Sequence, residues 1–221
     1  MPESGRRLGI YGILCILMLT GSALAADMSL PSPTLPLRQK AYTLLGKGQV
    51  ESVPAVLAQA VELARQQENL YVRANELRYI ASIWANTGNR DEARALYAEA
   101  MDYAIAIPTW NHRLYACIGV LEMQRNTGDI EGVHDNGMKA IESGLLEFVA
   151  QTGQAAETGR FFTAMNNAIT EEERGRIKER ILQLKNDKVE KKALHALDAV
   201  QVKPEPQPVI EEESPLLPAD D

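Results

Sequence analysis

The chain has 221 residues, of which 45% are hydrophobic, and a formal net charge of -7 at pH 7. An acidic chain has little attraction for a phosphate backbone, so we expect no nucleic-acid partner. Only one of the two cysteines, Cys117, lies beyond the first 25 residues. This composition argues against a disulfide framework or a thiol metal cluster, and stability must therefore come from burial.

The first 25 residues have the pattern of a secretory signal peptide. Arg6 and Arg7 precede an apolar run over residues 8–19, and Ala23-Leu24-Ala25 supplies the small residues that signal peptidase requires. We expect cleavage after Ala25 and a periplasmic or secreted mature protein that keeps no membrane span. The alternative is an inner-membrane anchor formed by an uncleaved signal, because this apolar stretch is nearly long enough to cross a bilayer.

The next residues, 26–36, are expected to be a flexible lead-in to a helical domain over residues 37–201. In that domain proline is nearly absent and good helix formers dominate. Gly48, Gly88 and Gly128 stand forty residues apart and indicate recurring helix ends. The predicted helices span residues 37–47, 52–68, 70–86, 90–107, 110–126, 130–150, 154–168, 171–185 and 187–201.

In the first two copies, residues at the equal distances from the glycines named below are all apolar. Four residues before them stand Leu44, Trp84 and Gln124; eight residues after them stand Val56, Leu96 and Asn136; twelve residues after them stand Ala60, Ala100 and Ala140. Each predicted helix thus has one row of apolar side chains to bury, and an alanine stands where two helices approach closely. One hairpin cannot cover both stripes, so neighbouring hairpins are expected to stack into a solenoid.

The third copy is the weakest, because Gly132, Gly137 and Gly144 fall in its predicted second helix. Glycine in a helix interior costs about 1 kcal/mol relative to alanine, so we expect local looseness there. A degenerate repeat held by its neighbours is the favoured interpretation. A hinge, or a place where another backbone lies close, is the alternative.

The second copy resembles the tetratricopeptide repeat. It has that family's large apolar residue, hydrophobic-small pair, aromatic, turn and small-aromatic-small triplet at Leu77, Ile80-Ala81, Trp84, Gly88, Ala93, Tyr97 and Ala100. The period of forty resembles long-helix variants of the family, whose common period is about thirty-four. The resemblance implies an all-α, right-handed α-solenoid of helical hairpins, which the helix at 187–201 would cap.

The resemblance also implies that a partner binds in a concave groove lined by the first helix of each hairpin. The predicted site is Arg38, Tyr42, Asn75, Arg78, Ser82, Tyr115, Glu122 and Arg125. Ile118 shares the same offsets. Three of these residues, Arg38, Arg78 and Arg125, are expected to anchor anionic groups, because a guanidinium can bind a carboxylate through two parallel hydrogen bonds. The alternative is that all are ordinary exposed helix residues.

Little in the sequence indicates catalysis. His112, His134 and His195 lack metal-ligand spacing and are expected to be solvated, and Cys117 falls at a core position and is expected to be buried and inert. No glycine-rich phosphate loop or cofactor motif is found, so no cofactor and no metal site are predicted. Residues 202–221 hold five prolines and six acidic residues and are expected to form a disordered tail.

These observations favour a non-enzymatic periplasmic scaffold or adaptor that binds a peptide or protein partner. A self-assembling structural protein of the envelope is the second hypothesis, and homo-oligomerisation is compatible with both. A small-ligand-binding protein or an enzyme with a pocket between stacked helices is the third.

Overall fold

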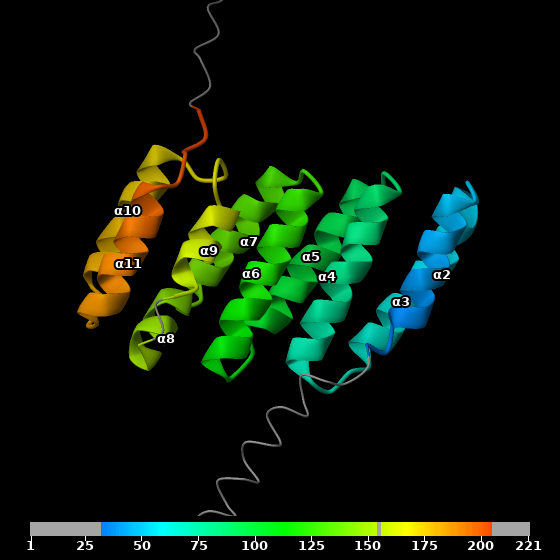
Figure 1. Ribbon diagram of the computed structural model, residues 1–221, viewed down its shortest axis with the longest axis horizontal. Coiled ribbons are helices and arrows are strands. Elements are labelled where there is room, and N and C mark those ends of the chain that lie inside the picture. Colours follow the sequence, from blue (N-terminus) through cyan, green and yellow to red (C-terminus); the bar gives the residue numbers. More distant parts are fainter. Residues whose placement is uncertain (1–31, 154–155, 205–221) are drawn as a thin grey trace, which may run out of the picture. The chain divides into compact units, whose positions relative to one another are not determined.

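The computed structural model describes residues 32–153 and 156–204, and every regular element in them is helical (Figure 1). The predicted all-α class is therefore confirmed for this part of the chain. None of the described helices is long and apolar enough to cross a membrane. The predicted signal peptide, most of the lead-in and residues 205–221 lie outside the described residues. Contacts divide the chain into two compact units, and the first ends in the sequence at Gln67 and the second begins at Glu68.

The first unit contains helix α2 (Leu35–Gly46), the short 3-10 helix η1 (Val50–Ser52) and helix α3 (Val53–Arg65). Both α-helices carry proline in their first turn, where a missing backbone N–H costs no hydrogen bond. Helix α2 packs against α3. Ala41, Val53, Leu57 and Ala60 are fully buried in this unit.

The second unit begins with four long helices: α4 (Leu70–Asn86), α5 (Arg90–Ile105), α6 (Trp110–Asn126) and α7 (Ile130–Glu142). Helices α4 and α5 form one hairpin and α6 and α7 the next, while α6 packs on both helices of the first hairpin and α7 packs on α5 (Figure 1). Large side chains such as Leu77, Tyr97 and Leu121 are fully buried. The predicted small contacts Ala100 and Ala140 are fully buried as well.

The forty-residue repeat has an equivalent turn in each copy. Gly88 and Gly128 adopt positive φ angles of 86° and 80°, and Gly48 one of 73°. In each copy the glycine N–H bonds the carbonyl three residues earlier, and the next residue bonds the carbonyl five residues before it. This double bond pattern ends a helix in a left-handed turn that glycine adopts without strain. The predicted helix ends are therefore confirmed.

The prediction of one helix over residues 130–150 was wrong. Gly144 takes a φ of 88°, which ends α7 and starts α8 (Leu145–Thr152) in a new direction. A residue in this conformation cannot continue a right-handed helix. The apolar run Leu145 to Ala150 had suggested continuation, but it buries its own face, with Leu145, Leu146 and Val149 nearly inaccessible.

The last three helices are α9 (Thr158–Ala164), α10 (Glu171–Leu182) and α11 (Asp187–Asp198). Thr170 caps α10 and exchanges hydrogen bonds with Glu173, the acidic residue three positions on. Helix α11 packs on α9 and α10. It buries one apolar face, made of Val189, Ala193 and Leu197.

Two polar residues of the third copy occupy core positions and bond each other. Asn136 Nδ2 donates to Gln124 Oε1 at 2.8 Å, and Gln124 Nε2 donates to Asp129 Oδ2 at 2.8 Å. Gln124 is inaccessible and Asn136 is 4% exposed. A Cβ added to Gly132 would lie 2.0 Å from Gln124 Nε2, so this glycine makes room for the bonded amides.

Candidate functional site

Six of the eight predicted site residues lie on two adjacent helices of the second unit. Helix α4 carries Asn75, Arg78 and Ser82, and helix α6 carries Tyr115, Glu122 and Arg125. The two helices pack directly against each other. Arg38 and Tyr42 lie on α2 of the first unit, where Tyr42 is 49% exposed. There Arg38 donates to the hydroxyls of Thr34 and Ser32.

The predicted anionic anchor Arg125 caps the end of α9. Its Nη1 donates to the carbonyl oxygens of Thr163 at 3.2 Å, Ala164 at 3.3 Å and Asn166 at 2.7 Å. The last carbonyls of a helix have no partner within it, and a cation there also complements the helix dipole. One guanidinium nitrogen is therefore committed to α9, and the anchoring capacity of Arg125 is smaller than the sequence suggested.

Glu122 also reaches α9, where it binds Arg160. Arg160 Nη2 donates to both carboxylate oxygens of Glu122 at 2.9 Å, and its Nη1 donates to Glu157 at 3.3 Å. The hydrogen bonds that Arg160 donates to Glu122 raise the pKa of Arg160 further above its ordinary value. The sequence did not indicate Arg160, because α9 lies outside the forty-residue register.

A hollow of about 380 Å³ opens along this contact between α6 and α9. It is lined by Glu122, Arg125, Asn126, Arg160, Thr163, Ala164 and Asn166. Two of these are predicted site residues. The lining combines two guanidinium groups, one carboxylate and two carboxamides, so it offers both donors and acceptors with little net charge.

The other predicted residues differ in their accessibility. Tyr115 is 41% exposed, and its hydroxyl lies 3.5 Å from Glu157. Ser82 donates to the backbone oxygen of Tyr79. Ile118 is inaccessible, so the expectation that it faces a groove was wrong: its side chain belongs to the core.

Arg78 lies against a glycine of the neighbouring helix. A Cβ added to Gly119 would lie 1.6 Å from Arg78 Nη1 and 2.5 Å from its Cζ, so the missing side chain makes room for the guanidinium. The guanidinium also lies 4.9 Å from the centre of the Tyr79 ring. Arg78 Nε and Asn75 Oδ1 are buried and have no hydrogen-bond partner among the described residues. Unpaired buried polar atoms are rare and call for an explanation.

Two side chains elsewhere that could take part in catalysis, Cys117 and His112, are buried in the fold. Burial raises the pKa of the Cys117 thiol to about 12, so it stays protonated at neutral pH and is a poor nucleophile. The prediction that His112 is solvated was wrong, because it is 9% exposed and its ring lies 4.9 Å from that of Tyr71. Among the described residues, no three His, Cys, Asp or Glu side chains gather as metal ligands would.

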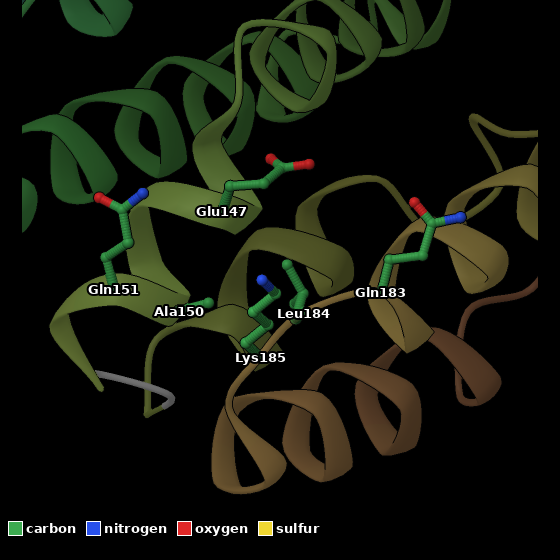
Figure 2. A pocket seen from close by; sticks show the side chains of 6 residues that line it. All are labelled: Glu147, Ala150, Gln151, Gln183, Leu184 and Lys185. Carbon is green, nitrogen blue, oxygen red and sulfur yellow. The ribbon is translucent and has the colours of Figure 1, made fainter.

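A second hollow, of about 270 Å³, lies beside α8 and the turn between α10 and α11 (Figure 2). Arg180 bonds one carboxylate oxygen of Glu147, and the other oxygen is buried without a partner in the described part of the chain. In Figure 2 the polar ends of Glu147, Gln151 and Gln183 spread around the edge and do not converge on one point. This arrangement does not indicate a catalytic centre.

Comparison of the chain with protein-family models, with curated proteins and with solved structures finds no match. The case for a function therefore depends on the described residues and on the repeat pattern.

Proposed function

We propose that the protein is a non-enzymatic interaction module that binds a peptide or protein segment along α4, α6 and α9. We propose also that it is exported and acts in the periplasm or outside the cell, as the sequence of residues 1–25 suggests. The resemblance to the tetratricopeptide repeat belongs to the same proposal. Its support is the recurrence of equivalent glycine turns within the helical hairpins, two of which, α4–α5 and α6–α7, pack on each other.

The observation that carries the proposal is the hollow between α6 and α9. Two residues chosen from the sequence, Glu122 and Arg125, line it together with Arg160 and Asn166. Side chains from two helices thus present donors and acceptors over one concave surface. Binding sites combine such concavity with a few placed polar groups.

The charges of the hollow define the chemistry of the partner. Because Glu122 pairs with Arg160 and Arg125 is partly committed to α9, no strong positive field remains there. Main-chain amides and neutral polar side chains fit this lining better than a run of carboxylates. The exposed ring of Tyr115 adds an apolar contact on the same helix.

The test is selection of peptides from a random displayed library on the immobilised protein, followed by affinity measurements with two matched variants. Asn126 is exposed and lines the hollow, while Asn86, forty residues earlier, is exposed at the end of α4 and away from it. Asn126→Trp should fill the hollow and weaken binding about tenfold, equivalent to about 1.4 kcal/mol. Asn86→Trp should leave the affinity within about twofold. Equal affinities for wild type and Asn126→Trp would reject the site.

Self-assembly is favoured by a separate observation in the first unit. Leu35, Tyr42 and Val50 are 42%, 49% and 45% exposed, which places three large apolar side chains on its surface. Leu35 and Tyr42 stand seven residues, about two turns, apart on α2 and so share one face of that helix. Exposed apolar groups on one face mark association surfaces. Light scattering across a hundredfold range of protein concentration tests this, since self-assembly predicts a rising mass that Tyr42→Ser lowers. A constant monomer mass would exclude it.

A further inference from the structure

The outer face of α11 carries a stripe of basic side chains. At about 100° per residue, Lys188, Lys191, Lys192 and His195 fall within an arc of about 100°. All four are exposed, and the arc lies opposite the buried face of the helix. The acidic residues of α11, at positions 187, 190 and 198, fall outside this arc.

The three lysines of this stripe have no ion-pair partner in residues 32–153 and 156–204. The neighbouring helix α10 bonds differently: its Lys178 pairs with Asp198 at 3.7 Å, and Arg174 pairs with Glu171 at 2.6 Å. The stripe is thus an exposed surface of positive charge whose lysines are not engaged in ion pairs within the described part of the chain. Three adjacent like charges repel one another, so an anionic group placed over them lowers the energy.

The chain is fixed where it leaves α11. Asn167 donates its backbone N–H to Gln201 O at 2.7 Å, and Lys203 donates to Ile169 O at 2.8 Å. The backbone N–H of Gln201 also donates to Asn166 Oδ1 at 2.6 Å. Residues 201–203 are therefore held beside the segment that leads into α10, although the sequence had placed the start of a disordered tail at residue 202.

The sequence that follows this anchor is strongly acidic. Residues 205–221 contain six carboxylates, Glu205, Glu211, Glu212, Glu213, Asp220 and Asp221, and no lysine, arginine or histidine. The nearest end of α10 carries Glu171, Glu172 and Glu173 in its first turn and repels them. Positive charge lies on Lys203, two residues before this segment, and on the lysines of the stripe on α11.

The acidic segment is long enough to reach the basic stripe of α11. Lys192 and Lys188 precede Val200 by eight and twelve residues, which is about 12 and 18 Å along a helix. Glu211 follows Pro204 by seven residues, which can span up to about 23 Å. Residues 201–204 separate Val200 from Pro204 by at most about 13 Å, so Lys192 and Lys188 lie at most about 25 and 31 Å from Pro204. Glu213 follows Pro204 by nine residues, which can span up to about 30 Å, and the two side chains add to this reach. The triplet of glutamates can therefore reach the stripe without straining the anchor at Lys203.

We propose that residues 205–221 dock in cis on the basic stripe of α11. Tethering gives the acidic segment an effective concentration of about a millimolar, so weak charge pairs suffice to hold it. The docked segment covers the basic stripe and so blocks other polyanions from binding there. They gain access to the stripe only when the segment is displaced or when salt screens its contact with α11. This inference does not depend on the peptide surface of α4, α6 and α9.

The test is zero-length carbodiimide coupling of the full chain at low ionic strength, with the joined residues identified by peptide mass spectrometry. The expected product joins Glu211, Glu212 or Glu213 to Lys188, Lys191 or Lys192 within one chain. Its yield should not depend on protein concentration, and about 0.5 M NaCl should lower it at least fivefold.

Charge reversal gives the matched controls. Lys188→Glu/Lys191→Glu/Lys192→Glu should abolish coupling of the glutamate triplet, whereas Lys40→Glu/Lys47→Glu in the first unit should not change it. Adding Glu211→Lys/Glu212→Lys/Glu213→Lys to the α11 variant should restore the contact, seen as coupling in the opposite sense. Coupling of the triplet to lysines elsewhere, coupling only between two chains, or no coupling would each overturn the proposal.

Discussion

The buried amide pair between α6 and α7 gives the sharpest test of how the third hairpin is held. Asn136 donates to Gln124, and both side chains are excluded from solvent. Asn136→Leu keeps the shape of the side chain but leaves a buried oxygen of Gln124 without its donor. Leaving a buried polar atom unpaired costs about 1–3 kcal/mol, so we expect a loss of about 2 kcal/mol in the free energy of unfolding.

The companion change is Gln124→Met, which also leaves its partner unpaired and should cost about 2 kcal/mol. The double variant removes both polar groups, and Asp129 keeps its bonds from Arg94 and from the backbone N–H of Gly132. It should therefore cost no more than either single change, which gives a coupling of about 2 kcal/mol. Urea unfolding followed by circular dichroism measures all four proteins. If the losses in unfolding free energy of the two single variants add to that of the double variant within about 0.5 kcal/mol, Asn136 and Gln124 are not coupled.

Three further changes test other contacts of the second unit. Gly119→Ala should cost about 1–3 kcal/mol of unfolding free energy, because its methyl group displaces the Arg78 guanidinium, and Arg78→Ala should relieve most of that cost in the double variant. Arg125→Ala should speed amide hydrogen exchange in α9 far more than in α4, since it frees three carbonyls; equal changes in both helices would contradict this. Burial lowers the pKa of His134, but its bonds to Glu173 and Asp135 outweigh this and raise the pKa above 6.5. The melting temperature of the wild type should exceed that of His134→Gln by its full margin below about pH 6.5, and this margin should disappear as the pH rises through the raised pKa. A constant difference in melting temperature from about pH 5 to 9 would contradict this.

The turns of the fold could be predicted from the sequence because their chemistry is local. Gly88 and Gly128 each follow a helix and precede Asn89 and Asp129, whose side chains accept from the backbone of the next helix. A glycine that adopts the left-handed conformation, followed directly by a helix-capping residue, indicates the end of one helix and the start of the next, independently of distant parts of the chain. The stripe of equivalent core positions followed directly from that register.

The break at Gly144 could not be predicted in the same way. It interrupts a stretch without proline, and glycine inside a helix differs in sequence from glycine at a helix end only by its surroundings. His112 was also misjudged, since its burial depends on Tyr71 from another helix. Long-range contacts of this kind leave no periodic signal in one sequence.

The candidate site was partly predictable for a related reason. Helix geometry fixes which residues share a face, so offsets from the turn glycines selected Glu122 and Arg125 correctly as neighbours on α6. Their partners Arg160 and Asn166 come from the region of α9, where no repeat register exists to place them. The positive character expected of the groove was therefore overestimated, because the compensating contacts were not visible.

The most direct test of the binding surface is amide chemical-shift mapping on isotopically labelled protein, titrated with a peptide selected on the wild type. The largest shifts should fall on residues 115–126 of α6 and 160–166 at the end of α9, with smaller shifts on α4. Shifts confined to α5 and α7, with α6 and α9 unchanged at saturation, would contradict it.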